Sequence, residues 1–222
     1  MDNDLAALRV LNEHVDTTAI CDVAKDTRVM SAALTCRSAN PRLCGKALTV
    51  RCRDDFLGVI QAIEAAQPGD VIVVDGGGRE TALAGELFAR AALAKGIAGI
   101  IVDGGYRDLA YVRGCDLAIY SRWVTPMAGA TQRLATPGHT VTCGGVPVSP
   151  GDIVIADADG IVVLDPATAR ATLVAAARVR DTEERVVARL ERGDPLGACL
   201  NLAEHTARLG RGEPSALTFT VP

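Results

Sequence analysis

Aromatic side chains are scarce in this sequence, and their scarcity excludes one class of function. Only 3% of the 222 residues are Phe, Trp or Tyr, although 49% are hydrophobic. Proteins that bind single-stranded nucleic acid stack the bases on aromatic side chains. The few rings here are scattered along the chain, so we expect no base-stacking surface. The core is expected to consist of Ala, Val, Leu and Ile.

An excess of positive charge is also absent. The formal net charge is -4, and the sequence pI is about 5.4. Nucleic acids and anionic membranes attract proteins through basic surfaces. We therefore expect neither as a partner, whereas a small anionic substrate bound with the help of a metal is compatible with this composition.

Signals for disulfides, secretion and membrane spans are missing. The seven cysteines are an odd number and contain no C-x-x-C pair. The first residues form no basic and apolar leader, and no apolar run approaches the roughly 18 residues of a membrane span. The sequence therefore predicts reduced thiols and a cytoplasmic protein.

The length suits one α/β domain. A chain of 222 residues can bury a substantial core without disulfides. No linker interrupts the pattern, so we expect a single domain over residues 1–222. Its core should span about 17–165, and a C-terminal helical extension should span about 166–210.

Two short apolar runs predict parallel strands in the middle of the chain. Residues 71–74 and 99–102 are apolar throughout, as in strands buried on both faces. The segment from Thr81 to Lys95 predicts a helix that ends at Gly96. A strand, helix and strand in this order predict two parallel neighbours in one sheet.

The remaining elements follow from caps, β-branched runs and turns. Asp4 and Asp16 are expected to cap two N-terminal helices. Further predictions are a strand at 48–50, a helix at 55–66, a strand at 117–120, a hairpin at 152–164 and a long helix from Pro166 to about Arg192.

A near-repeat follows the two central strands. Residues 74–80 and 102–108 share the pattern V-D-G-G-x-R-acid at an offset of 28 residues. Parallel strands would bring both copies to the carboxyl edge of the sheet, where open α/β folds bind ligands. The alternative is a pair of tight turns whose arginines and acids are solvated or paired with each other.

The glycines of the first copy do not form a dinucleotide site. After Gly76 and Gly78, Thr81 stands where the motif G-x-G-x-x-G needs its third glycine, and Arg79 lies inside the turn. The phosphate-binding pattern G-x-x-x-x-G-K-[ST] does not occur either. Nucleotide binding is therefore disfavoured.

Glu86, Arg107 and Asp108 form the candidate site. Glu86 lies near the start of the predicted helix, and the other two follow the second strand. Two carboxylates suit a hard divalent cation that keeps several waters. Backbone N–H groups of residues 85–88 can bind a carboxylate if the helix begins there. The Arg107 guanidinium can bind a carbonyl or carboxylate oxygen.

Five segments carry a resemblance to a known family. They are GELFA (85–89), GIAG (96–99), VDGGYRD (102–108), GGVPVSPGD (144–152) and DGIVV (159–163). Together they resemble the RraA-like family, which includes the 4-hydroxy-4-methyl-2-oxoglutarate/4-carboxy-4-hydroxy-2-oxoadipate aldolases. The resemblance extends from about Thr17 to Gly193, and its most specific element is an acid followed after twenty residues by Arg-Asp. Glu86 stands where many of these aldolases carry Asp.

The resemblance implies a swivelling β/β/α fold with N- and C-terminal helices. It implies a homotrimer or homohexamer with the site between subunits. Asp108 would bind Mg²⁺ or Mn²⁺, and Glu86 would contact a metal-bound water. Arg107 would polarise the substrate, and the backbone of Gly85, Leu87 and Phe88 would hold its carboxylate.

The resemblance also implies a metal contact from a neighbouring subunit. Glu183, in the long C-terminal helix, best matches the Glu that supplies this contact in the family, and Glu184 is the alternative. A salt bridge to Arg180 at helical spacing is the competing interpretation of both residues.

The implied activity is a divalent-metal-dependent (class II) aldolase. Such an enzyme cleaves 4-hydroxy-2-oxo acids, such as 4-hydroxy-4-methyl-2-oxoglutarate, to pyruvate through an enolate, and it also decarboxylates oxaloacetate. A cation and Arg107 can stabilise the developing negative charge, so no Schiff-base lysine is required. The alternative is a non-catalytic regulator that binds protein and controls ribonuclease activity. That branch of the family lacks the acid matching Asp108, so Asp108 favours the enzyme.

Overall fold

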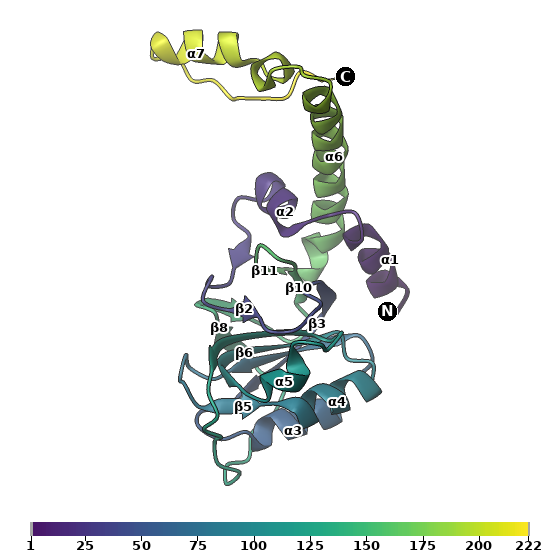
Figure 1. The fold of residues 1–222 in the computed structure, drawn as a ribbon, viewed down its shortest axis with the longest axis vertical. Helices are drawn as coiled ribbons and strands as arrows, with labels where there is room; N and C mark the ends of the chain where they lie inside the picture. Colours follow the sequence, from purple (N-terminus) through teal and green to yellow (C-terminus); the bar gives the residue numbers. More distant parts are fainter. Residues whose placement is uncertain (1, 222) are drawn as a thin grey trace.

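A mixed β-sheet with helices at both ends of the chain forms the fold in a computed structural model (Figure 1), which describes residues 2–221 and the side chains from residue 5 onward. The strands are β1 (Arg28–Val29), β2 (Thr35–Cys36), β3 (Leu43–Arg51), β4 (Asp70–Asp75), β5 (Ala82–Ala84), β6 (Gly99–Tyr106), β7 (Ala118–Val124), β8 (Val141–Cys143), β9 (Val146–Val148), β10 (Ile153–Ala156) and β11 (Ile161–Leu164). The α-helices are α1 (Asp2–Asn12), α2 (Thr17–Val23), α3 (Leu57–Ala65), α4 (Glu86–Ala94), α5 (Leu109–Val112), α6 (Pro166–Glu191) and α7 (Leu202–Gly210), with a 3₁₀ turn, η1, at Leu196–Cys199.

Four parallel strands occupy the centre of the main sheet. The strand order is β1-β11-β10-β3-β4-β6-β7-β2, and β5 pairs with β6 beside this path. β3, β4, β6 and β7 run parallel, while the outer strands pair antiparallel. The predicted pair of parallel neighbours is confirmed, because β4 and β6 pair from Val71 opposite Gly99 to Val74 opposite Val102.

Aliphatic side chains fill the core on both faces of this sheet. On one face, α3, α4 and α5 cover a cluster that includes Ala62, Ile72, Ala89 and Ile100, all fully buried. The other face packs against the β8–β9 ribbon and residues 30–34. The prediction of a core poor in aromatic rings is therefore confirmed, with Tyr106 and Tyr120 as its largest fully buried side chains.

The helix α6 projects away from the sheet and carries η1 and α7 at its far end (Figure 1). Its base packs against α1 and α2. Asp165 caps it by accepting a hydrogen bond from the Ala167 N–H at 2.8 Å, and Pro166 occupies its first turn. The predicted long helix and the predicted hairpin before it are both confirmed.

Several predicted boundaries are wrong. The strands β3 and β7 extend beyond the predicted ranges 48–50 and 117–120. Residues 82–84 form β5 rather than the first turn of a helix, because Ala82 and Ala84 pair with Gly105 and Tyr106. For the same reason β6 continues to Tyr106 instead of ending at Val102. The helix α1 begins at Asp2, so Asp4 lies inside it and not at the position before it. The predicted cap by Asp16 is confirmed at 2.9 Å from the Ala19 N–H.

No helix within residues 2–221 is both long and apolar enough to cross a membrane.

The buried carboxylate of Asp157 joins α2 to the β10–β11 hairpin. It accepts hydrogen bonds from the backbone N–H and the hydroxyl of Thr17, at 2.7 and 2.8 Å. It also accepts one from the Asp159 N–H at 3.0 Å. Because the carboxylate is buried, removing it leaves buried donors without a partner.

We expect Asp157→Ala to lower the free energy of unfolding by about 3 kcal/mol, since two or more buried donors lose their acceptor. Chemical denaturation checks this value. Asp159→Ala is the matched control, because its side chain is exposed. Equal stability of the two variants would contradict the role given to Asp157.

Candidate functional site

The start of α4 and the end of β6 meet at Gly85 and Asp108. Gly85 is the N-cap of α4, and Asp108 is the N-cap of the short helix α5. The Arg107 N–H donates to the Ala84 carbonyl at 3.1 Å, and the buried Tyr106 hydroxyl donates to the Gly85 carbonyl at 3.2 Å. These two bonds fix the end of β6 against the residue that opens α4.

Asp108 lies at the centre of this junction. Its backbone is left-handed, with φ at 60° and ψ at 42°, a conformation that Asp and Asn adopt more readily than most residues. Its Oδ2 accepts a hydrogen bond from the Glu86 N–H at 3.0 Å and lies 3.6 Å from the Arg107 Nε. Its Oδ1 has no hydrogen bond to any described residue. The side chain is 41% exposed, so the carboxylate is accessible to solvent.

The first turn of α4 presents backbone donors. The N–H of Ala89 bonds to the Gly85 carbonyl, as in a regular helix. The N–H groups of Leu87 and Phe88 have no hydrogen-bond acceptor among residues 2–221. Unpaired donors and the helix dipole favour an anion at this position. The sequence analysis required the helix to begin near residue 85 if these N–H groups are to bind a carboxylate, and α4 does begin at Glu86.

Arg107 lines an apolar hollow of about 280 Å³ together with Leu87 and Phe88. The hollow lies between α3 and α4, and the Phe56 and Phe88 rings meet edge to face at 5.8 Å between their centroids. Its lining residues are Phe56, Ile60, Ile63, Glu64, Leu87, Phe88, Ala91 and Arg107. Arg107 is 40% exposed, so its charge is accessible to a bound molecule.

Glu86 points along its own helix. Its Oε1 accepts a hydrogen bond from the Arg90 Nε at 2.8 Å, and this bond raises the pKa of Arg90. Arg90 also stacks over the Tyr111 ring, with 4.1 Å between Cζ and the ring centroid. Sequence reasoning missed Arg90 and Tyr111, although the spacing of four residues between Glu86 and Arg90 predicts a helical ion pair.

The junction holds carboxylates, which are the donor type that a hard divalent cation takes. No group of three or more His, Cys, Asp or Glu side chains able to hold a metal is present in the described part of the chain. Magnesium in proteins is often held by one or two carboxylates and completes its shell with water and substrate oxygens. Asp108 offers one such carboxylate, whereas the Glu86 carboxylate is bonded to Arg90.

Glu183 lies on the projecting helix α6 and pairs with Arg180, which donates to its Oε2 at 2.9 Å. Arg180 also lies 3.3 Å from Asp16. Within one chain, α6 lies apart from α4 and α5 (Figure 1). The competing interpretation of Glu183 as a helical salt bridge is therefore confirmed within the chain, and its contact to a neighbouring subunit stays a prediction.

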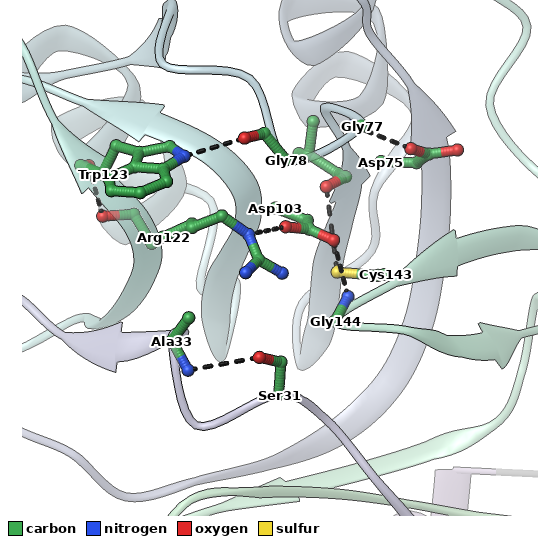
Figure 2. Close-up of polar contacts among 12 residues, drawn as sticks. Ser31, Ala33, Asp75, Gly77, Gly78, Asp103, Arg122, Trp123, Cys143 and Gly144 are labelled. Carbon is green, nitrogen blue, oxygen red and sulfur yellow. Dashed lines mark hydrogen bonds and ion pairs between the residues drawn. The ribbon is translucent and has the colours of Figure 1, made fainter.

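The aspartates of the near-repeat hold the ends of the central strands together. Asp103, in β6, accepts hydrogen bonds from the Arg122 Nε at 2.6 Å and from the Gly144 N–H at 2.7 Å (Figure 2). The Gly78 N–H donates to the Asp103 carbonyl, and its own carbonyl accepts from the Trp123 indole. Asp103 is buried, so it organises the sheet edge rather than meeting a ligand.

The arginines of the two copies differ in their surroundings. Arg79, from the first copy, pairs with Asp54, a residue with a left-handed backbone. Only the second copy places its arginine and acid beside the start of α4. The structure thus brings Glu86, Arg107 and Asp108 together and leaves Arg79 outside this group.

The buried thiol of Cys143 has a pKa well above its ordinary value because of its burial, which makes it unreactive.

Comparison with known proteins gives one family. The RraA-like family model, described as Aldolase/RraA, matches residues 17–163. A protein of Halalkalibacterium halodurans named "Putative 4-hydroxy-4-methyl-2-oxoglutarate aldolase" is 35% identical over 152 residues, which are 68% of this chain and 72% of that protein.

Two solved structures are similar as well. The RNA-processing inhibitor RraA from Thermus thermophilis is 31% identical with a TM-score of 0.63, over 67% of this chain and 91% of that one. RraAS2 of Streptomyces coelicolor, described as an unusual member of the RNase ES inhibitor RraA protein family, is 32% identical with a TM-score of 0.69. That match covers 80% of this chain and 93% of the other.

Proposed function

Because this chain belongs to the RraA-like family, and because Arg107 and Asp108 lie beside the free amides of α4, we propose that it is a metal-dependent aldolase. Its substrates would be 4-hydroxy-2-oxo acids such as 4-hydroxy-4-methyl-2-oxoglutarate, cleaved to pyruvate, and it would also decarboxylate oxaloacetate. The name of the Halalkalibacterium relative supports the first of these reactions. The observation that carries the proposal is the half-exposed Asp108 carboxylate, whose Oδ2 lies 3.6 Å from the Arg107 Nε and accepts a hydrogen bond from the Glu86 N–H.

The residues of the junction fit the charge of a 2-oxo acid. The N–H groups of Leu87 and Phe88 would bind the C1 carboxylate, since both are unpaired and lie at a helix N-terminus. Arg107 would hydrogen-bond the C2 carbonyl oxygen. Asp108 would hold Mg²⁺ or Mn²⁺, with Glu86 acting through a bridging water, and the cation would supply Lewis-acid stabilisation of negative charge.

The reaction places negative charge where these residues can meet it. The C4 hydroxyl releases its proton to solvent, and C4 becomes the carbonyl carbon of the second product as the C3–C4 bond breaks. The electron pair of that bond moves into a pyruvate enolate, which takes up a proton from solvent at C3. Decarboxylation of oxaloacetate breaks the corresponding C3–C4 bond and forms the same enolate. A guanidinium already positioned at the C2 oxygen stabilises both transition states without reorganisation.

An assay of pyruvate formation tests this function. We expect 4-hydroxy-4-methyl-2-oxoglutarate and oxaloacetate to yield pyruvate with Mg²⁺ or Mn²⁺ present, and we expect EDTA to abolish the reaction until metal is added back. Arg90→Gln is a useful comparison, because it removes the ion pair of Glu86 without touching Arg107 or Asp108. Pyruvate formation unaffected by EDTA, or absent with both acids, would contradict the proposal.

A second candidate function is the inhibition of an RNA-degrading endonuclease. The similarity to the Thermus RNA-processing inhibitor and to the Streptomyces member of the RNase ES inhibitor family supports it. In such a role the chain would bind the endonuclease, and Asp108 would take part in no reaction. An RNA cleavage assay with and without this chain separates the two candidates, since an aldolase leaves the cleavage rate unchanged.

A further inference from the structure

A second group of charged side chains surrounds two adjoining hollows away from the candidate site. The hollows measure about 420 and 200 Å³ and share Arg51, Leu134 and Ala135 in their linings. Neither is lined by Glu86, Arg107 or Asp108. We call this region the basic groove, because Arg51, Arg53, Arg133 and His139 line it.

The acids beside the basic groove are already compensated. The buried Asp75 accepts hydrogen bonds from the Arg51 Nε at 3.1 Å, from the Arg53 Nη2 at 3.0 Å and from the Gly77 N–H at 3.0 Å. Figure 2 shows the contact between Asp75 and Gly77. Two guanidinium groups thus meet one carboxylate, which leaves an excess of positive charge at the end of β3.

Asp55 is compensated by backbone amides. Its carboxylate accepts hydrogen bonds from the N–H groups of Leu57, Gln132 and Arg133, at 3.0, 2.6 and 2.9 Å. Burial opposes ionisation of this carboxyl, but the amides and the nearby Arg133 charge outweigh burial and lower its pKa. Among the described residues, the hydrogen-bond partners of the Asp55 carboxylate are all backbone N–H groups. The Arg133 guanidinium acts on this carboxylate only through the attraction between their charges.

The arginines keep donors for a ligand. Arg51 uses only its Nε for Asp75, and its side chain is 61% exposed. The exposed guanidinium of Arg133 forms no hydrogen bond or ion pair with any residue in the described range 2–221. Guanidinium groups bind carboxylates and phosphates through paired N–H donors, with shorter and stronger bonds than neutral donors give.

We propose that the basic groove binds a small anion that carries a carboxylate or a phosphate. The hollows are large enough for a metabolite, and the excess positive charge lies in a chain whose net charge is -4. The proposal does not depend on the aldolase function, because the two sets of residues are separate. Arg133 supplies the free guanidinium, and Arg51 and Arg53 supply further charge in the lining of the same hollow.

Calorimetric titration with malonate and with inorganic phosphate tests the proposal. The titrations use the Arg107→Gln chain at low salt, so that the guanidinium of the candidate site does not contribute. We expect this chain to bind at least one of the two anions. Adding Arg133→Gln should weaken binding about tenfold, which is the typical loss of a charged hydrogen bond. Adding Arg170→Gln, an exposed arginine on α6, should leave it unchanged.

Three results would overturn the proposal. One is no measurable binding of either anion, and another is equal affinity in the Arg133→Gln and Arg170→Gln chains. The third is a change of oligomeric mass in the Arg133→Gln chain, measured by sedimentation, which would assign the groove to a contact between subunits. Thermal unfolding of every variant checks that Arg133→Gln leaves the fold intact. A preference for malonate or for phosphate identifies which of the two anionic groups the groove selects.

Discussion

Asp108→Asn is expected to lower the rate of pyruvate formation by about 100-fold or more, which is the scale of losing a metal ligand or a preorganised charge. Asn is the informative replacement because it also tolerates the left-handed backbone at this position. Its side-chain oxygen can still accept the hydrogen bond from the Glu86 N–H. The substitution therefore removes the negative charge and retains the local geometry.

Thermal unfolding and the metal dependence of the residual rate check this interpretation. We expect Asp108→Asn to unfold near the wild-type temperature and to need a much higher metal concentration for its remaining activity. Asp103→Asn is a useful contrast, since it changes a buried carboxylate of the same near-repeat that bonds to Arg122 and Gly144. Asp108→Asn with wild-type activity would remove Asp108 from the proposed mechanism.

Gly85→Ala is the second change with a large expected effect. A Cβ at this position would overlap the Asp108 Oδ2 and lie 2.9 Å from the Arg107 Cγ. The backbone of Gly85 is extended, with φ at -165°, so Ala strains no torsion and acts only through this overlap. Displacing two site residues by about 1 Å should reduce the rate of pyruvate formation about 100-fold.

The matched control for Gly85→Ala is Gly114→Ala, where the nearest atom to an added Cβ is 3.9 Å away. Both variants replace one glycine by alanine, so only the position differs. We expect the control to retain full activity in the same assay. Full activity of Gly85→Ala would show that neither Arg107 nor Asp108 needs its present position.

The sequence predicts the centre of the fold because the relevant signals are local. Residues 71–74 and 99–102 are apolar throughout, and strands with this pattern are buried on both faces. Such a run of apolar residues predicts a strand buried on both faces without any knowledge of its neighbours in the sheet. The cap of α2 at Asp16 and the hairpin closed at Gly160 are local in the same sense.

The strand β5 escaped prediction because its residues carry no strand signal. Ala82 and Ala84 favour a helix by intrinsic propensity. They are extended because Gly105 and Tyr106 offer them a neighbouring backbone, and this partner is more than twenty residues away. Tertiary pairing thus overrides local preference, and it also moves the start of α4 to Glu86.

The sequence predicted which residues form the candidate site, but it predicted fewer of the contacts that these residues make. The spacing of Glu86, Arg107 and Asp108 identified the three residues, and the fold brings them together. The pairing of Glu86 with Arg90 follows from helical spacing, so it was open to prediction. The basic groove was not, because Arg51 and Arg133 are 82 positions apart in the sequence and only the fold brings them to the lining of one hollow.

The helix α6 sets the direction as well as the reach of everything beyond it. An α-helix turns by about 100° and advances about 1.5 Å with each residue. Inserting a single residue before Glu183 would therefore rotate that carboxylate, η1 and α7 by about 100°, a little over a quarter of a turn, around the helix axis. Inserting seven residues would nearly restore the direction and lengthen the helix by about 10 Å. The number of residues between the cap at Asp165 and Glu183 thus fixes the rotational position of Glu183 on the helix. This segment should tolerate substitutions far better than insertions.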